Sequence, residues 1–246
     1  MEKIAIISDI HGNVPALEAV LEDIQKRSIK RIFCLGDLVG KGPHSEKTVD
    51  IIRQTCEVVV QGNWDEMITR EHTHETMKWH QMRLGKERLD YLDSLPFSHE
   101  FLMSGKLIRL FHASANSLFT RVYPWSSMAE QEGMFANTEM THHHFDQTPD
   151  VVGYGDIHYA FLHHIQHRIL FNTGSVGNPL EITQASYAIM EGEYDSNEPS
   201  SFSVQLVRVP YDIELAVAQA RAENMPALEE YIVELRTAVY RGRQKK

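Results

Sequence analysis

Short apolar runs alternate with an amphipathic helical pattern over the first quarter of the chain, and this alternation narrows the choice of fold more than any other feature. Residues 3–8, 31–35 and 58–60 are rich in β-branched side chains, as is typical of strands buried on both faces. Between the first two runs, apolar side chains in residues 17–24 repeat with helical spacing. A βαβαβ order of this kind predicts an α/β fold with a parallel sheet.

The later part of the chain shows a different pattern. Residues 84–95 repeat leucine on one helical face up to Pro96, which ends the pattern. Ser104-Gly105-Lys106 between two apolar runs is typical of a hairpin, so we expect more antiparallel pairing here. Helical periodicity over residues 212–242, interrupted near Pro226, predicts two terminal helices. The strands expected in this part are residues 101–103, 107–111, 187–190 and 202–209.

Length and charge narrow the possible functions. A chain of 246 residues fits one large domain, and we expect a single domain over residues 1–246. The formal net charge of −10 disfavours binding to a nucleic-acid polymer, because that affinity comes from Lys and Arg neutralising phosphates. A phosphate-containing substrate would therefore need bound cations, which are often the largest local charges in a site.

The N-terminal residues and the cysteines indicate the compartment. The apolar stretch within residues 1–7 is too short for a signal peptide or a membrane span, so we expect a cytoplasmic protein without a membrane partner. The chain contains only Cys34 and Cys56, and both lie in apolar, strand-like runs. This placement favours buried reduced thiols over a disulfide framework or a nucleophile.

Polar residues suited to chemistry stand directly after the apolar runs. Ligands of open α/β sheets bind beyond the carboxyl ends of the strands, so side chains at these positions should converge on one crevice. The residues that end the successive runs are Asp9 and His11, Asp37, Asn63, His112, and Asp156 with His158.

A set of carboxylates and imidazoles suits Mn, Fe or Zn. One carboxylate can bridge two ions because it has two oxygens, and Asp37 is our candidate for the bridge. Two cations roughly 3.5 to 4 Å apart can lower the pKa of a shared water and clamp the attacking and leaving oxygens of an in-line displacement. Phosphoester hydrolysis is the reaction that such a site predicts.

The motifs around these residues resemble those of the calcineurin-like metallophosphoesterase family. They follow the family order D-x-H, G-D-x-V-x-x-G-P, G-N-x-D, a strand-terminal His, and G-x-x-H, and they span most of the chain. A further turn, Asn172-Thr173-Gly174-Ser175-Val176-Gly177, resembles the family's N-P-G-S-x-G. In this sequence the motifs are residues 9–11, 36–43, 62–65, 111–112 and 155–158.

The resemblance implies an α/β/β/α sandwich with two mixed sheets and a binuclear metal centre. It places Asp37 between the two ions as their bridge, with Asn63 orienting the phosphate, so these two residues are the expected catalytic ones. It also implies attack on phosphorus by a hydroxide that bridges the metals. The remaining ligands are implied to be Asp9, His11 and His158 on one metal, and Asn63, His112 and Asp156 on the other.

Two departures from the family pattern refine this expectation. Asp156 stands where the family's G-H-T-H has an imidazole, and an anionic oxygen ligand should favour Mn or Fe over Zn. Trp64 replaces the His that is thought to assist the leaving group, and indole has no titratable proton near neutrality. A phosphate or nucleotide leaving group fits such a site better than an alkoxide. The chain is thus similar to bacterial members of the family that hydrolyse diadenosine tetraphosphate asymmetrically.

Substrate contacts are expected from a segment at about residues 114–148, which resembles an insertion of the kind that varies substrate choice in this family. Its Arg121 can pair with phosphate oxygens, while Tyr123 and Trp125 can hold a base. Trp64 either stacks on a base or packs under its loop. These residues predict a small nucleotide substrate, such as a dinucleoside polyphosphate.

Several alternatives stay open at this point. The resemblance also permits a protein serine/threonine phosphatase, or a catalytically inactive metal-binding scaffold. His72, His74 and His80 are possible replacement acids, although a solvated helix explains them equally well. The tract at residues 142–144 consists of histidines within a polar segment, which favours an exposed loop over a metal tract. The sequence does not determine the oligomeric state.

Overall fold

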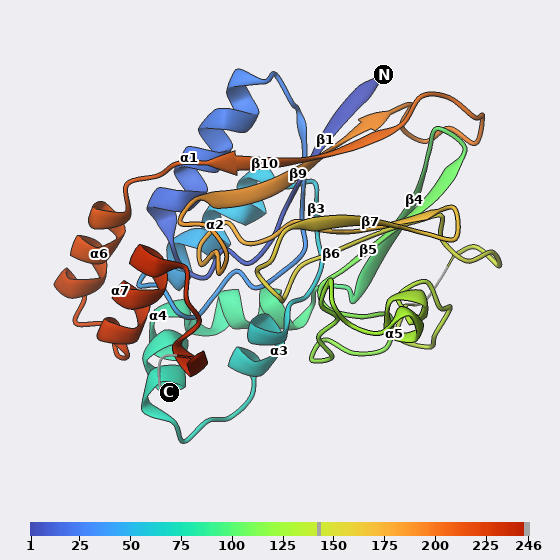
Figure 1. Cartoon of the computed structure of the whole chain (residues 1–246). Helices are drawn as coiled ribbons and strands as arrows, with labels where there is room; N and C mark the ends of the chain where they lie inside the picture. Colours follow the sequence, from blue (N-terminus) through green and yellow to red (C-terminus); the bar gives the residue numbers. More distant parts are fainter. Residues whose placement is uncertain (142–143, 244–246) are drawn as a thin grey trace.

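The computed structural model describes residues 1–141 and 144–243, and two five-stranded mixed sheets lie at its centre (Figure 1). The first sheet has the strand order β10-β9-β1-β2-β3. Its strands β1, β2 and β3 are parallel, whereas β9 is antiparallel to both β1 and β10. The parallel part confirms the alternation predicted from the sequence. These strands are β1 (Glu2–Ile7), β2 (Arg31–Cys34), β3 (Val58–Val59), β9 (Ala185–Gly192) and β10 (Ser203–Val209).

The second sheet has the order β4-β5-β6-β8-β7. The predicted hairpin is present as β4 and β5, which are antiparallel, as are β7 and β8 at the other edge. The two central pairs, β5 with β6 and β6 with β8, are parallel, so antiparallel pairing is confined to the edges of this sheet. The strands are β4 (Ser98–Met103), β5 (Lys106–Phe111), β6 (Val151–Tyr154), β7 (Phe161–Ile165) and β8 (Arg168–Asn172).

The two sheets pack face to face through an apolar core. Ile4 and Phe33 of the first sheet belong to the same buried cluster as Ile108 and Phe171 of the second. Successive residues of a strand point to opposite faces, so the neighbouring Ala5 faces the helices instead. This packing fixes the two sheets against each other, and it confirms the predicted α/β architecture with two mixed sheets.

Helices cover the outer face of the first sheet (Figure 1). In the first helix Leu17, Val20 and Ile24 are buried, and the Asn13 side chain accepts a hydrogen bond from the backbone N–H of Ala16 at its start. The two C-terminal helices predicted on either side of Pro226 are also present. The helices are α1 (Val14–Lys26), α2 (Ser45–Thr55), α3 (Asn63–Thr69), α4 (Glu75–Asp93), α6 (Ile213–Ala222), α7 (Leu228–Thr237) and the short η1 (Arg241–Arg243).

The outer face of the second sheet is covered by the segment between β5 and β6, which is mostly irregular and contains one short helix, α5 (Met128–Gly133). Val122, Met134 and Phe135 of this segment pack against Tyr154 and Leu170 of the sheet. Most of the expected insertion at residues 114–148 therefore forms the fourth layer of the molecule.

The strands expected at residues 187–190 and 202–209 lie in β9 and β10, which pair antiparallel to each other, and β9 joins the first sheet beside β1. Two details differ from the sequence predictions. Helix α4 begins at Glu75, ahead of the predicted start, and it is kinked at Gly85, where φ of 68° and ψ of 168° are not helical, so the predicted helix corresponds to the part around and after this kink. Cys56 follows helix α2, whereas the sequence predicted that it lies in a strand-like run.

Both thiols are free, and burial raises their pKa values, that of Cys56 to about 12. A thiol with a raised pKa carries little nucleophilic thiolate at neutral pH. No helix within the described part of the chain has the length and apolarity required to cross a bilayer. Residues 142–143 of the histidine tract lie outside the described residues, while the exposed His144 donates its backbone N–H to Glu100 Oε2.

Candidate metal centre

The strand ends of both sheets meet at one place, and the predicted ligands gather there. Asp9 and His11 follow β1, Asp37 follows β2, and Asn63 opens α3 just beyond β3. His112 follows β5, and Asp156 with His158 follows β6. Every one of these side chains is buried, with at most 6% of its surface exposed. Two groups with metal-ligand geometry result: Asp9 with His11 and His158, and Asp9 with Asp37 and His112.

The backbone at this place is strained. Five of the predicted ligands have left-handed φ angles, which non-glycine residues seldom adopt. Conformations of this kind cost of order 1–3 kcal/mol each and persist where the surrounding structure enforces them, commonly at functional sites. The angles are 55° for Asp9, 49° for His11, 55° for Asp37, 61° for Asp156 and 58° for His158.

All three imidazoles are oriented in the same way. The Nδ1 atom of His11 donates to the carbonyl of Val39 at 2.9 Å. His112 Nδ1 donates to Leu35 O at 2.6 Å, and His158 Nδ1 to Asn178 O at 2.5 Å. A carbonyl only accepts, so Nδ1 carries the proton and Nε2 presents a lone pair to the centre. This is how protein scaffolds orient metal-binding histidines.

The first group of ligands converges on a point between Asp9 and two histidines. The Nε2 atoms of His11 and His158 lie only 3.1 Å apart. Asp9 Oδ1 is 3.2 Å from His158 Nε2 and 3.8 Å from His11 Nε2. It is also buried without a hydrogen bond among the described residues. Lone pairs facing one another in this way repel unless a cation lies between them, so this donor set fits a metal ion.

Asp9 belongs to both groups, and Asp37, a member of the second group, also lies close to the first. Its Oδ2 lies 3.5 Å from His11 Nε2, and its Oδ1 lies 3.4 Å from His112 Nε2. One oxygen therefore faces each group, as a bridging carboxylate requires. The second group is completed by Asn63 Oδ1 at 3.1 Å and Asp156 Oδ1 at 3.9 Å from His112 Nε2.

The electrostatics favour positive charge in the second group. Burial lowers the pKa of His112, but Asp37, Asp9 and Asp156 outweigh burial and raise it well above its usual value. The carboxylates that stabilise a proton on this imidazole would equally stabilise a metal cation beside it. The residues present thus fit a centre with two cations.

Asp65, the last residue of the predicted G-N-x-D motif, holds the loop that carries Asp37. Its Oδ2 accepts the backbone N–H groups of Asp37 at 2.7 Å and Gly62 at 2.9 Å. Its Oδ1 accepts that of Leu38 at 2.9 Å. The family motif includes Asp65, but the sequence alone did not indicate that its carboxylate accepts hydrogen bonds from backbone N–H groups of this loop.

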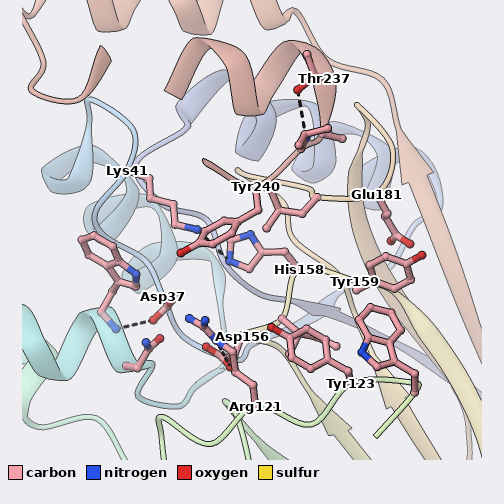
Figure 2. A pocket seen from close by; sticks show the side chains of 17 residues that line it. Asp37, Lys41, Arg121, Tyr123, Asp156, His158, Tyr159, Glu181, Thr237 and Tyr240 are labelled. Carbon is pink, nitrogen blue, oxygen red and sulfur yellow. Dashed lines mark hydrogen bonds and ion pairs between the residues drawn. The ribbon is translucent and has the colours of Figure 1, made fainter. Parts of the chain in front are cut away.

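A cavity of about 410 Å³ opens over the ligands, within the size range of small-molecule sites (Figure 2). It includes the predicted substrate residues Trp64, Arg121 and Tyr123. The Arg121 Nε atom pairs with Asp156 Oδ2 at 3.3 Å. The two cationic side chains of the lining are Lys41 and Arg121, and its aromatic ones are Trp64, Tyr123, Trp125, Tyr159 and Tyr240.

Trp64 packs against its loop, which is one of the two roles considered for it. Its indole packs so tightly on Gly40 that a Cβ at this glycine would lie 2.2 Å from the ring, and φ at Gly40 is 82°. The same indole meets His11 edge-on at 5.9 Å between ring centroids and borders the cavity. Contact of this ring with a base stays a prediction.

Sequence reasoning missed several residues beside the metal ligands. Lys41 Nζ donates to Asn178 Oδ1 at 3.0 Å and lies 3.4 Å from His158 Nε2. Glu234 on α7 accepts from Asn178 Nδ2 at 3.2 Å, although it is distant in sequence. Lys41 lies inside a quoted motif and Asn178 directly follows one, so both had a signal. Nothing in the sequence indicated Glu234 or Tyr240.

The other histidines do not reach the centre. His80 is buried under the helices, where its Nδ1 lies 3.0 Å from Ser45 Oγ. His72 Nε2 donates to Met67 O, and His74 precedes α4 as its cap residue. His163 Nδ1 lies 3.0 Å from Gln131 Oε1 on the far sheet. None of them lines the cavity within the described residues.

Known proteins support the relationship that the motifs indicated. Residues 2–195 match the calcineurin-like phosphoesterase superfamily domain. An uncharacterised protein from Methanocaldococcus jannaschii is 30% identical over 255 aligned residues, which cover 91% of this chain and 93% of that protein. The crystal structure of a metallophosphoesterase from Sphaerobacter thermophilus superposes with a TM-score of 0.75 at 26% identity, covering 97% of this chain and 99% of that one. Phosphodiesterase YfcE from Escherichia coli K12 is 31% identical over 101 residues, which cover 36% of this chain and 55% of YfcE.

Proposed function

Because the chain belongs to the calcineurin-like phosphoesterase superfamily, we propose that it is a two-metal phosphoesterase that hydrolyses a small nucleotide phosphodiester or phosphoanhydride. A dinucleoside polyphosphate is the substrate that we propose. The observation that carries this proposal is the cavity above the ligands, which joins two cationic side chains to a set of aromatic ones. Cations complement phosphate oxygens and aromatic faces complement bases.

We further propose the distribution of ligands over the two ions. Asp37 faces both histidine groups and would bridge them. Two divalent cations at this place would activate water and stabilise the charge of the attacking and leaving oxygens. Mn or Fe would suit the added carboxylate of Asp156. Asp9, His11 and His158 would hold one ion, and Asn63, His112 and Asp156 the other.

The protein's own cations would bind the substrate phosphates. Lys41 and Arg121 both line the cavity, and burial lowers the pKa of Lys41 to about 8, which leaves the amine mainly protonated at neutral pH. An Arg guanidinium can pair with two phosphate oxygens at once, whereas Lys acts as a point charge. These local charges would offset the overall acidity of the chain.

The identity of residue 64 favours a leaving group that needs little protonation. Trp64 donates its backbone N–H to Asp37 Oδ1 at 2.8 Å and offers no titratable side chain. Phosphate and nucleotide leaving groups carry their negative charge readily, whereas an alkoxide requires a proton. A phosphoanhydride bond therefore suits this site.

The test is hydrolysis by purified protein loaded with Mn, Fe or Zn. Bis(p-nitrophenyl) phosphate, diadenosine tetraphosphate, a cyclic nucleotide and a phosphoserine peptide would be compared by kcat/KM, with products separated by chromatography. We expect the dinucleotide to be preferred and to give ATP and AMP. Preference for the phosphopeptide would replace the proposal with a protein phosphatase. Metal binding without turnover of any substrate would instead indicate an inactive scaffold.

A further inference from the structure

The C-terminal residues contribute to the cavity although they lie beyond the matched family domain, which ends at residue 195. The chain leaves helix α7 at Thr237, and residues 238–240 border the cavity opposite the strand ends. We name residues 238–242 the C-terminal strap. The strap is therefore an addition to the family domain that reaches its central site.

The strap has a defined path. Ala238 turns it sharply at the end of α7, with a φ of 55°. Arg241 then returns to α7, where its Nε and Nη2 atoms donate to Glu234 at 2.8 and 2.7 Å, and its backbone N–H donates at 3.0 Å. Glu234 has no exposed surface. A buried carboxylate with this many donors fixes the strap in one position.

The anchor of the strap also contacts the metal centre. Glu234 accepts from the side chain of Asn178, whose carbonyl orients His158 and whose Oδ1 accepts from Lys41. The strap is thus connected by hydrogen bonds, through Glu234 and then Asn178, to a candidate metal ligand and to a cation of the cavity lining. Its position over the cavity is tied to the geometry of the site.

Tyr240 is the part of the strap that faces the substrate space. Figure 2 shows its ring beside Lys41 and His158, with Arg121 and Tyr123 on the other side of Asp156. Burial lowers the pKa of Arg121, but the carboxylate of Asp156 outweighs burial and keeps this guanidinium charged within the cavity. Tyr240 keeps 41% of its surface exposed, which leaves its ring accessible.

The cavity has a second aromatic surface, in which two side chains contact each other. Tyr123 and Trp125 stack on each other with centroids 5.0 Å apart and planes at 9°. Trp125 is 60% exposed at the edge of the cavity. Tyr240 lies beside Lys41 and His158 in the same cavity, so a base in contact with its ring would leave the attached phosphates near Lys41 (Figure 2).

We propose that Tyr240 is a specificity-determining residue that packs against the nucleobase of the substrate, and that the C-terminal strap exists to place it there. This proposal rests on the proposed function, since it names the part of the nucleotide that the same site recognises. An aromatic face binds any base, so the strap would select nucleotides over base-free phosphates without reading the base.

The test is binding of ADP and of pyrophosphate to the Mn-loaded protein by calorimetry, because these ligands share a diphosphate and differ in the nucleoside. We expect the ratio of ADP to pyrophosphate affinity to fall about tenfold in Tyr240→Ala and to be restored in Tyr240→Phe. Val233→Ala changes an exposed residue of α7 outside the cavity and serves as the matched control. Thermal unfolding of each variant would show that the fold is intact.

The outcomes separate the two proposals. Loss of hydrolysis for every substrate, with ADP still bound through Tyr240, would refute the proposed reaction and leave the base contact standing. An unchanged affinity ratio in Tyr240→Ala would overturn the role of Tyr240, whatever the turnover. With turnover intact, Tyr240→Ala should raise KM for the dinucleotide and change kcat little, because a contact to the base is made equally in the bound substrate and in the transition state.

Discussion

At the scale of single residues, the site depends on backbone geometry as much as on side-chain type. Asp9 and Asp37 take left-handed conformations, and neighbouring chain segments hold them there: the Asp9 N–H donates to Gly36 O and the Asp37 N–H to Asp65. The strain is thus distributed over hydrogen bonds between loops. Substitutions that keep side-chain shape should therefore remove chemistry without disturbing the fold.

Replacing Asp37 with Asn tests the bridge. Asn keeps an oxygen for the Trp64 N–H but removes the charge that faces both histidine groups. We expect hydrolysis of bis(p-nitrophenyl) phosphate to fall by at least about 100-fold, and the metal content to drop, since two-metal catalysis needs both ions in place. Activity assays with elemental analysis would measure this. Full activity in Asp37→Asn would refute the bridging role.

Replacing Arg121 tests the phosphate contact. Arg121→Lys keeps the charge but loses the planar fork, so we expect kcat/KM for the dinucleotide to fall about tenfold, and further in Arg121→Ala. Arg53→Ala, at a surface ion pair with Glu87, is the control and should match the wild type. Steady-state kinetics would decide, and equal kcat/KM values for Arg121→Ala and wild type would exclude the contact.

The site was more predictable from the sequence than its surroundings were. Each predicted ligand, from Asp9 to His158, closely follows an apolar run. Residues that are neighbours in a short motif remain neighbours in the folded chain, so the motif alone predicts which side chains occur together. Asn178 and Glu234 are 56 residues apart, and their contact depends on where the terminal helices pack. Long-range pairings of this kind leave no local pattern in one sequence.

At the scale of elements, strands were easier to find than to assign to a sheet. The β-branched runs identified β1 and β2 because burial on both faces favours such residues, and the hairpin signal identified β4 and β5. The placement of β9 next to β1 depends on pairing across most of the chain, and periodicity does not encode it. Helix α4 was shortened in the prediction because its first half is polar and its apolar periodicity is weak.

Helix α4 carries a buried histidine that should make stability depend on pH. Burial and Arg83 lower the pKa of His80 from 6.5 to about 4, although Glu46 opposes them. The unfolded chain therefore binds a proton more readily, and stability should fall as the pH drops from about 6.5 to about 4. The difference between these two pKa values corresponds to about 3 kcal/mol.

Urea unfolding at pH 7 and pH 4.5 would measure this loss. His80→Gln should lose less stability between these pH values than the wild type, because its side chain does not titrate. His164→Gln, at an exposed position, should behave as the wild type. An equal loss in His80→Gln and wild type would assign the pH dependence to other groups.

A buried ion pair attaches the outer segment to the second sheet. Arg109 on β5 donates to Glu100 on β4 at 2.6 Å, and also to Ala136 O and Asn137 Oδ1 of the segment between β5 and β6. Arg109→Met would leave Glu100 buried and uncompensated, so we expect a loss of about 3–5 kcal/mol of stability.

The same change should release the segment that carries Arg121. Limited proteolysis should cut Arg109→Met within residues 114–141 faster than the wild type. The double variant Arg109→Met, Glu100→Gln removes the stranded charge and should regain part of the stability. If the single variant resists protease as well as the wild type, other contacts hold the segment.

At the scale of the whole molecule, metal binding should contribute to stability. The ligands are buried carboxylates and imidazoles whose charges face one another, so a cation that binds only the folded chain stabilises it. At a metal concentration about 100 times its dissociation constant, the gain is about 2.7 kcal/mol.

Chelation should therefore lower Tm by roughly 5–10 °C for a chain of this size. Differential scanning calorimetry with EDTA, followed by the return of Mn, would measure the effect. Asp37→Asn should show a smaller response to EDTA than the wild type. A Tm that changes neither with EDTA nor with added Mn would contradict the ligand assignment.

The place where the ligands sit has a consequence for motion. Asp9, His11, Asp37 and Asn63 belong to the first sheet and its connections, whereas His112, Asp156 and His158 belong to the second. Asp37 thus faces His11 from the first sheet with one oxygen and His112 from the second sheet with the other. If one sheet moved along the other by about an ångström, Asp37 could no longer keep both of these short distances. The metal centre is therefore complete only while the two sheets keep this alignment. A shift of one sheet against the other would be detected as a loss of phosphoester hydrolysis.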